Sequence, residues 1–109
     1  MSDIRQLQDE IAKFCNDRDW GQFHNLKDLS AAIAIEAGEL QECFLWKRPD
    51  EAKPEKIREE LADVFIYALR MADRAGVEVA EIVREKIRLN AEKYPVEEVK
   101  GSAAKYTER

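Results

Sequence analysis

The chain has 109 residues and a formal net charge of -5 at pH 7, from 23 acidic and 18 basic side chains. Ala, Glu, Lys, Leu and Arg supply 55 of the residues, a share typical of long helices, and no segment alternates between apolar and polar residues as a half-buried strand does. This composition excludes a β-sandwich or barrel and a disordered chain, and the lack of a basic cluster excludes a nucleic-acid polymer as partner.

The spacing of the cysteines and the hydropathy of the chain indicate the cellular compartment. Cys15 and Cys43 lie 28 positions apart, without the spacing of metal ligands, which is typical of reduced thiols in the cytosol. We find no signal peptide and no apolar stretch of the roughly 18 residues that cross a bilayer. We therefore expect a cytoplasmic protein with no membrane partner.

Hydrophobic periodicity and end signals predict four helices, which makes the fold class all-α. The first spans 4–18 and opens with Asp3 and Gln6 at the spacing of a capping box. The second begins within 25–28 and ends at 46, and the third runs from Pro54 to Gly76. The fourth covers 78–93, before Pro95. We expect residues 1–95 to form one helical domain and residues 96–109 an extended arm or tail.

Two pairs of acids lie on the apolar faces of consecutive helices. At 100° per residue, Glu36 and Glu39 fall within about 60° of the apolar stripe of the second helix. Glu60 and Asp63 occupy the same kind of face on the third, beside Val64. Helices joined by a short loop pack antiparallel, so we expect the four carboxylates to meet.

Several explanations fit such a group of acids. Each pair alone is typical of a solvated surface, but burial of four carboxylates requires protonation or a divalent cation. Ligands that are all oxygen suit Mg²⁺ or Mn²⁺. A di-iron site would need Glu-x-x-His pairs, and the single histidine, His24, lies outside both helices. In a helical interaction module the acids would instead pair with residues such as Lys56 and Arg70.

The acidic pattern and its surroundings resemble the all-α nucleoside triphosphate pyrophosphohydrolases, the MazG-like group, and within it the dCTP pyrophosphatase branch. The resemblance follows the chain in order through these stretches: Arg18-Asp19-Trp20, Gln22-Phe23-His24, Glu36-Ala37-Gly38-Glu39-Leu40, Phe44-Leu45-Trp46-Lys47, Glu59-Glu60-Leu61-Ala62-Asp63-Val64-Phe65-Ile66-Tyr67, Lys86, Asn90, Tyr94-Pro95 and Lys105-Tyr106-Thr107-Glu108.

The resemblance implies hydrolysis of dCTP or a 5-substituted dCTP to dCMP and pyrophosphate, as house-cleaning of the nucleotide pool. It implies that Glu36, Glu39, Glu60 and Asp63 hold Mg²⁺, with Mn²⁺ as a possible substitute, and that Glu39 or Glu36 deprotonates the attacking water. A cation also lets a chain of charge -5 bind a polyphosphate.

The remaining site residues follow from the same resemblance. Lys86 and Asn90, close together on the fourth helix, are expected to contact phosphate or sugar, with Lys86 counted among the catalytic residues. The candidate base pocket consists of Trp20, Gln22, Phe23, His24, Trp46 and Tyr67. Aromatic rings stack on any base, whereas choosing cytosine requires directional hydrogen bonds, for which His24 and Gln22 are available.

Two rival functions stay open. One is a pyrophosphohydrolase of the same fold that acts on another nucleotide such as dATP, dUTP or phosphoribosyl-ATP. The other is the non-enzymatic interaction module.

The third helix also predicts an assembly. Phe65 and Leu69 point away from the Glu60 face, which itself carries Val64. A helix with two apolar sides needs partners on both, so we expect a four-helix bundle that completes its core as a homo-oligomer. The resemblance implies a dimer or tetramer.

Overall fold

The computed structural model describes residues 2–103, and every regular element in that range is helical. The chain divides into two compact units, one up to Val77 and one from Glu78 onward. The first unit holds α1 (Asp3–Asp17), η1 (Gly21–Phe23), α2 (Leu26–Glu42), η2 (Pro49–Glu51) and α3 (Pro54–Ala75). The second holds α4 (Val79–Lys93) and α5 (Val96–Val99).

Short-range signals set most helix ends. The Asn25 side chain accepts a hydrogen bond from the Asp28 N–H at 2.8 Å and caps α2. Pro54 stands in the first turn of α3, and Gly76 ends that helix at φ 71°, a left-handed conformation that glycine adopts without a Cβ clash. These three ends agree with the sequence prediction.

Two ends differ from the prediction. The N-cap of α1 is Ser2, whose hydroxyl accepts the Arg5 N–H at 3.1 Å, so the capping box expected at Asp3 is wrong. Helix α2 ends at Glu42, four residues earlier than expected, and Trp46 follows in a turn with φ 62°.

The segment 96–109, expected to be an arm or tail, begins with the single helical turn α5.

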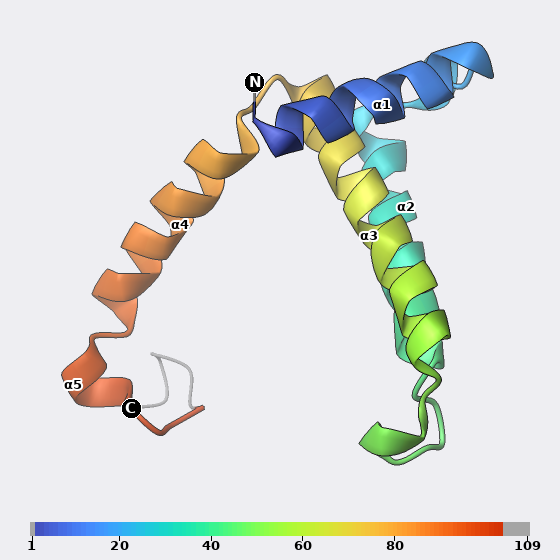
Figure 1. The fold of residues 1–109 in the computed structure, drawn as a ribbon. Helices are drawn as coiled ribbons and strands as arrows, with labels where there is room; N and C mark the ends of the chain where they lie inside the picture. Colours follow the sequence, from blue (N-terminus) through green and yellow to red (C-terminus); the bar gives the residue numbers. More distant parts are fainter. Residues whose placement is uncertain (1, 104–109) are drawn as a thin grey trace. The chain divides into compact units, whose positions relative to one another are not determined.

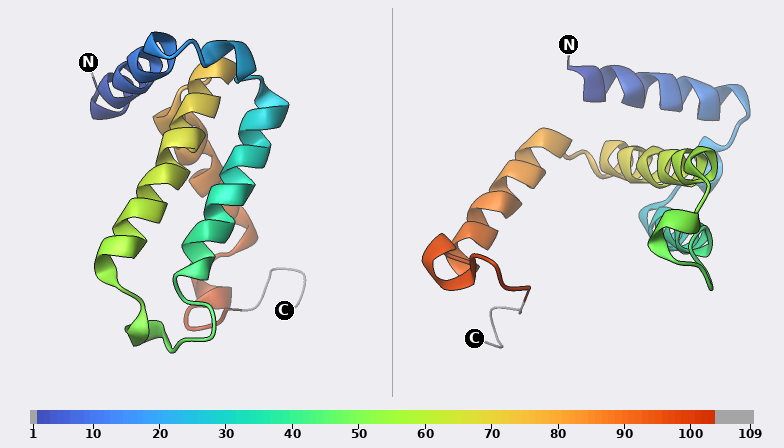
Figure 2. Two further views of the ribbon diagram at one scale, coloured as in Figure 1. Left: turned by 90° about the vertical axis from the view of Figure 1, so that its right-hand side faces the viewer. Right: turned by 60° about the horizontal axis from the view of Figure 1, so that its bottom comes forward.

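The first unit is built around α2 and α3, which run side by side in opposite directions, while α1 crosses one end of the pair (Figures 1 and 2). Two polar contacts fasten α1 to α3. Gln8 Nε2 donates to the Leu69 carbonyl at 3.0 Å, and Arg5 Nη2 lies 3.1 Å from Asp73 Oδ1. The opposite directions of α2 and α3 confirm the antiparallel packing that was expected for the second and third helices.

Few large apolar side chains are fully covered. Leu29 is 1% exposed and forms the centre of the core, together with Cys15, Cys43, Ala52 and Ala72. Among the described residues, three polar side chains are buried with them: Gln8, Glu60 and Arg70. None of the helices in the described part combines the length and apolar content that a bilayer span requires.

Candidate functional site

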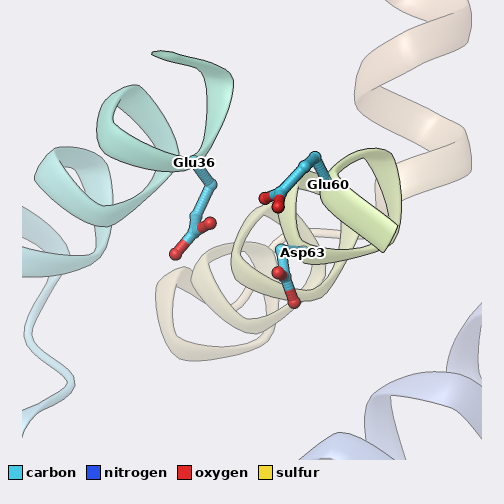
Figure 3. Close-up of side chains that lie close together, drawn as sticks. All are labelled: Glu36, Glu60 and Asp63. Carbon is cyan, nitrogen blue, oxygen red and sulfur yellow. The ribbon is translucent and has the colours of Figure 1, made fainter. Parts of the chain in front are cut away.

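Three of the four predicted acids converge where α2 packs on α3. Glu36 comes from α2, and Glu60 and Asp63 come from neighbouring turns of α3, which their spacing of three residues places on one face (Figure 3). One carboxylate oxygen from each lies within 4.8 Å of the others. We refer to these three residues as the acidic cluster.

The acidic cluster is crowded and poorly compensated. Glu36 Oε2 and Glu60 Oε2 are buried and lack a hydrogen-bond partner among the described residues. Burial raises the pKa of Glu36 to about 7, and interaction with Glu39, Asp63 and Glu60 adds to the rise. Lys56 Nζ, 3.1 Å from Glu60 Oε1, is the one cation paired with the cluster in the described part of the chain.

These features fit a hard divalent cation. Every donor is a carboxylate oxygen, as Mg²⁺ and Mn²⁺ prefer, and a cation would satisfy the two buried oxygens that have no partner. Glu39 interacts with Glu36 but is exposed and lies outside the three converging ligand atoms. The structure therefore assembles three acids as a possible ligand set, with the fourth beside them.

An apolar cavity of about 250 Å³ adjoins the acidic cluster and shares Asp63 with it. We call it the aromatic cavity. It brings together three predicted base-pocket residues, Trp20, His24 and Tyr67. Its other lining residues are mostly apolar: Ile11, Phe14, Cys15, Ile66 and Arg70. Trp20 and Phe14 pack edge to face, with ring centroids 5.7 Å apart.

The other predicted base-pocket residues do not line the aromatic cavity. Gln22 donates from Nε2 to the Asp19 carbonyl at 2.9 Å. Phe23 is 62% exposed, and Trp46 is 94% exposed in its turn after α2. Their contact with a base stays a prediction.

Arg70 is a residue of this cavity that the sequence analysis considered only as an ion-pair partner. It is 4% exposed, its Nε donates to His24 Nδ1 at 3.1 Å, and its Nη2 is buried without a partner among the described residues. Burial lowers the pKa of His24, and the charges of Arg70 and Arg74 lower it further. The sequence contains one signal that could have identified Arg70 as a cavity residue. It follows Tyr67 by three residues and Asp63 by seven, which places it on the same helical face.

A second, polar cavity of about 790 Å³ includes Glu60 of the acidic cluster and the neighbouring Glu39 in its lining. We call it the lysine cavity, because three lysines line it. The lining residues in chain order are Glu39, Glu42, Cys43, Lys47, Lys53, Glu55, Lys56, Glu59 and Glu60. The acidic cluster thus contributes to one mainly apolar and one charged cavity.

Lys86 and Asn90 are exposed on α4, in the second compact unit, as are all the residues of that helix from 81 to 93. Their contact with a substrate stays a prediction. The resembling stretch 105–108 lies outside the described residues.

Comparison with known proteins gives consistent matches. Residues 31–108 match the model of the MazG-like family. The chain is 40% identical to dCTP pyrophosphatase 1 of Mus musculus and 38% identical to that of Homo sapiens, in each case over 99% of this chain and 66% of the relative. It therefore spans just under two thirds of the length of these curated relatives.

A solved structure matches as well. It is a pyrophosphatase from Archaeoglobus fulgidus, with a TM-score of 0.81 and 35% sequence identity, and the match covers 87% of this chain and 94% of that one.

Proposed function

Because the chain belongs to the MazG-like family, we propose that it is a Mg²⁺-dependent pyrophosphohydrolase that converts dCTP, or a 5-substituted dCTP, and water to dCMP and pyrophosphate. The family membership confirms the resemblance drawn from the sequence motifs. The names of the curated relatives and of the solved pyrophosphatase support this activity.

One observation carries the proposal: the acidic cluster shares Asp63 with the aromatic cavity and Glu60 with the lysine cavity. The order is aromatic cavity, acids, lysine cavity. A nucleoside triphosphate has a matching order, with a flat base at one end and a polyphosphate at the other. The bond that a pyrophosphohydrolase breaks lies between them, next to the α-phosphorus. The arrangement fits a base in the aromatic cavity and the leaving pyrophosphate in the lysine cavity.

Glu36, Glu60 and Asp63 would hold the cation. When bound, Mg²⁺ supplies charge that polarises the α-phosphate and offsets the negative charge of pyrophosphate. The carboxylates themselves fix its position, and Lys47, Lys53 and Lys56 partly offset the charge of the five glutamates that line the lysine cavity.

In the proposed reaction, water oxygen attacks the α-phosphorus and the bond to the bridging oxygen of the β-phosphate breaks. The proton of the water goes to a carboxylate. Glu39 suits this role better than Glu36, because it lies beside the cluster without being one of the three converging ligands. Trp20 and Tyr67 would stack on the base and exclude water from it.

The test is pyrophosphate release with Mg²⁺ and each standard ribo- and deoxynucleoside triphosphate in turn. We expect dCTP to be the best substrate and EDTA to abolish turnover. Preference for dATP or dUTP would keep the reaction type but contradict the substrate. No turnover of any nucleotide, together with no thermal shift on adding metal, would favour the interaction module.

The substitution Glu60→Gln links the activity to the cluster. It removes a buried charge but keeps the side-chain volume, so we expect at least a hundredfold loss of kcat with a folded protein of similar or higher Tm. Glu10→Gln, which changes an exposed acid on α1, is the matched control and should keep wild-type kinetics. Full activity in Glu60→Gln would remove Glu60 from the site.

A further inference from the structure

The contact between His24 and Arg70 joins the loop before α2 to the buried face of α3. Both residues line the aromatic cavity, and 46 positions separate them in the chain. Arg70 Nε donates to His24 Nδ1 at 3.1 Å, and Arg74 Nε donates to the His24 backbone carbonyl at 3.1 Å. One arginine therefore holds the imidazole ring and the other holds the backbone of the same residue.

The hydrogen bond from Arg70 determines the protonation of the ring. An arginine donates only, so His24 Nδ1 must accept and cannot carry a proton. A neutral imidazole then has its proton on Nε2, which leaves that nitrogen as a hydrogen-bond donor. The lowered pKa of His24 agrees with a neutral ring near pH 7.

Burial also restrains the Arg70 guanidinium. Its Nε is engaged by His24, and its Nη1 lies 4.0 Å from Asp73 Oδ2. Its Nη2 is buried without a partner among the described residues and lies 3.6 Å from the position that a Cβ would take at Gly21. That arm of the guanidinium therefore faces η1, and Nε is the group through which Arg70 acts on His24.

Resting on the proposed function, we infer that Arg70 is a positioning residue for base specificity, because its hydrogen bond fixes His24 as an Nε2–H donor at the aromatic cavity. A donor in that place suits cytosine, whose N3 atom is an acceptor. Uracil and thymine carry N–H at position 3, which would face the donor and leave both groups unpaired.

The first experiment reads the tautomer directly. The chain contains one histidine, so ¹⁵N-histidine labelling of the untagged protein gives one pair of imidazole nitrogen signals. We expect a protonated Nε2 and an unprotonated, hydrogen-bonded Nδ1 at neutral pH. Arg70→Met should shift the Nδ1 signal, and Arg74→Met, the matched control, should not. A proton on Nδ1 in the wild-type protein would overturn the inference even if the Arg70 variant failed to fold.

The second experiment measures selectivity as the ratio of kcat/KM for dCTP to that for dUTP. Loss of the fixed His24 donor should lower this ratio about tenfold or more in Arg70→Met and leave it unchanged in Arg74→Met, with Tm and circular dichroism confirming that both variants are folded. An unchanged ratio in a folded Arg70→Met protein would refute the inference but leave the proposed hydrolysis standing. Absence of any wild-type turnover would refute the proposed function itself, while the ¹⁵N signals would still decide the His24 tautomer.

Discussion

At the scale of single residues, helical geometry predicted the acidic cluster but not its exact membership. Glu36, Glu60 and Asp63 meet as expected, because each lies on the face that its helix turns toward the other. Glu39 follows Glu36 at the same three-residue spacing that keeps Glu60 and Asp63 together, yet Glu39 is exposed and lies outside the three converging ligand atoms. The periodicity of the sequence does not distinguish the centre of such a stripe from its edge.

The role of Arg70 shows what the sequence could not supply. Its partner His24 lies 46 positions away, in the loop between η1 and α2. An arginine on an apolar stripe is often explained by a side chain that extends to water. Only the tertiary packing shows that this one stays inside.

Glu36 predicts a pH dependence that links folding to metal binding. Its pKa is raised to about 7 in the folded chain, so folding favours the protonated carboxyl. The metal-free protein should therefore lose stability as pH rises from the ordinary carboxyl range through about 7. Mg²⁺ requires the ionised form and should raise Tm more at about pH 8 than at about pH 5.

Thermal unfolding with EDTA and with MgCl₂ across this pH range measures both effects. Glu36→Gln is the control, because it removes the ionisable group while keeping the volume, and both pH trends should weaken. An Mg²⁺ shift that is equal at both pH values would contradict the link.

At the scale of elements, local signals located the helices well where caps or breakers were present. The end of α2 was misplaced because Cys43, Phe44 and Leu45 continue an apolar pattern and no breaker occurs before Pro49. In the structure these residues form turns in which each N–H bonds the carbonyl three residues back, as from Phe44 to Gln41 at 3.0 Å. Such a change from helix to turn is not encoded by hydrophobic periodicity.

Gly38 offers a test at the element scale, because it lies inside α2 between Glu36 and Glu39. A Cβ built at this position meets no atom within 4 Å among the described residues. Replacing an unhindered helical glycine with alanine should stabilise the protein by about 1 kcal/mol. Denaturant unfolding of Gly38→Ala measures this. Reduced stability, or a loss of activity or of assembly, would instead show that a ligand or another helix approaches the glycine.

At the scale of the whole molecule, the apolar surface exceeds what the described contacts cover. On α3, Leu61, Phe65 and Ile66 are 41%, 58% and 41% exposed within the single chain. The two-sided apolar pattern of this helix was readable from the sequence. What would cover its second side could not be read from the sequence, because a symmetric interface depends on the shape of the folded chain.

We therefore predict a homo-oligomer, a dimer or tetramer, in solution. Light scattering at micromolar concentration should give a mass that is a multiple of the 12.6 kDa chain. Phe65→Ser, which makes the exposed face of α3 more polar, should lower that mass or make it depend on protein concentration. A wild-type mass of one chain would contradict the prediction.

The ion pair between Lys56 and Glu60 has a consequence for the order of events in the cell. Lys56 extends from one turn earlier on α3 and is itself exposed, yet it neutralises a buried acid at 3.1 Å. Within the folded chain this lysine supplies a counter-charge to Glu60. If the cluster binds a cation as proposed, loading would be an exchange in which the cation releases Lys56 within the lysine cavity, which Lys56 already lines. Maturation and substrate capture would in this way use the same side chain at successive times.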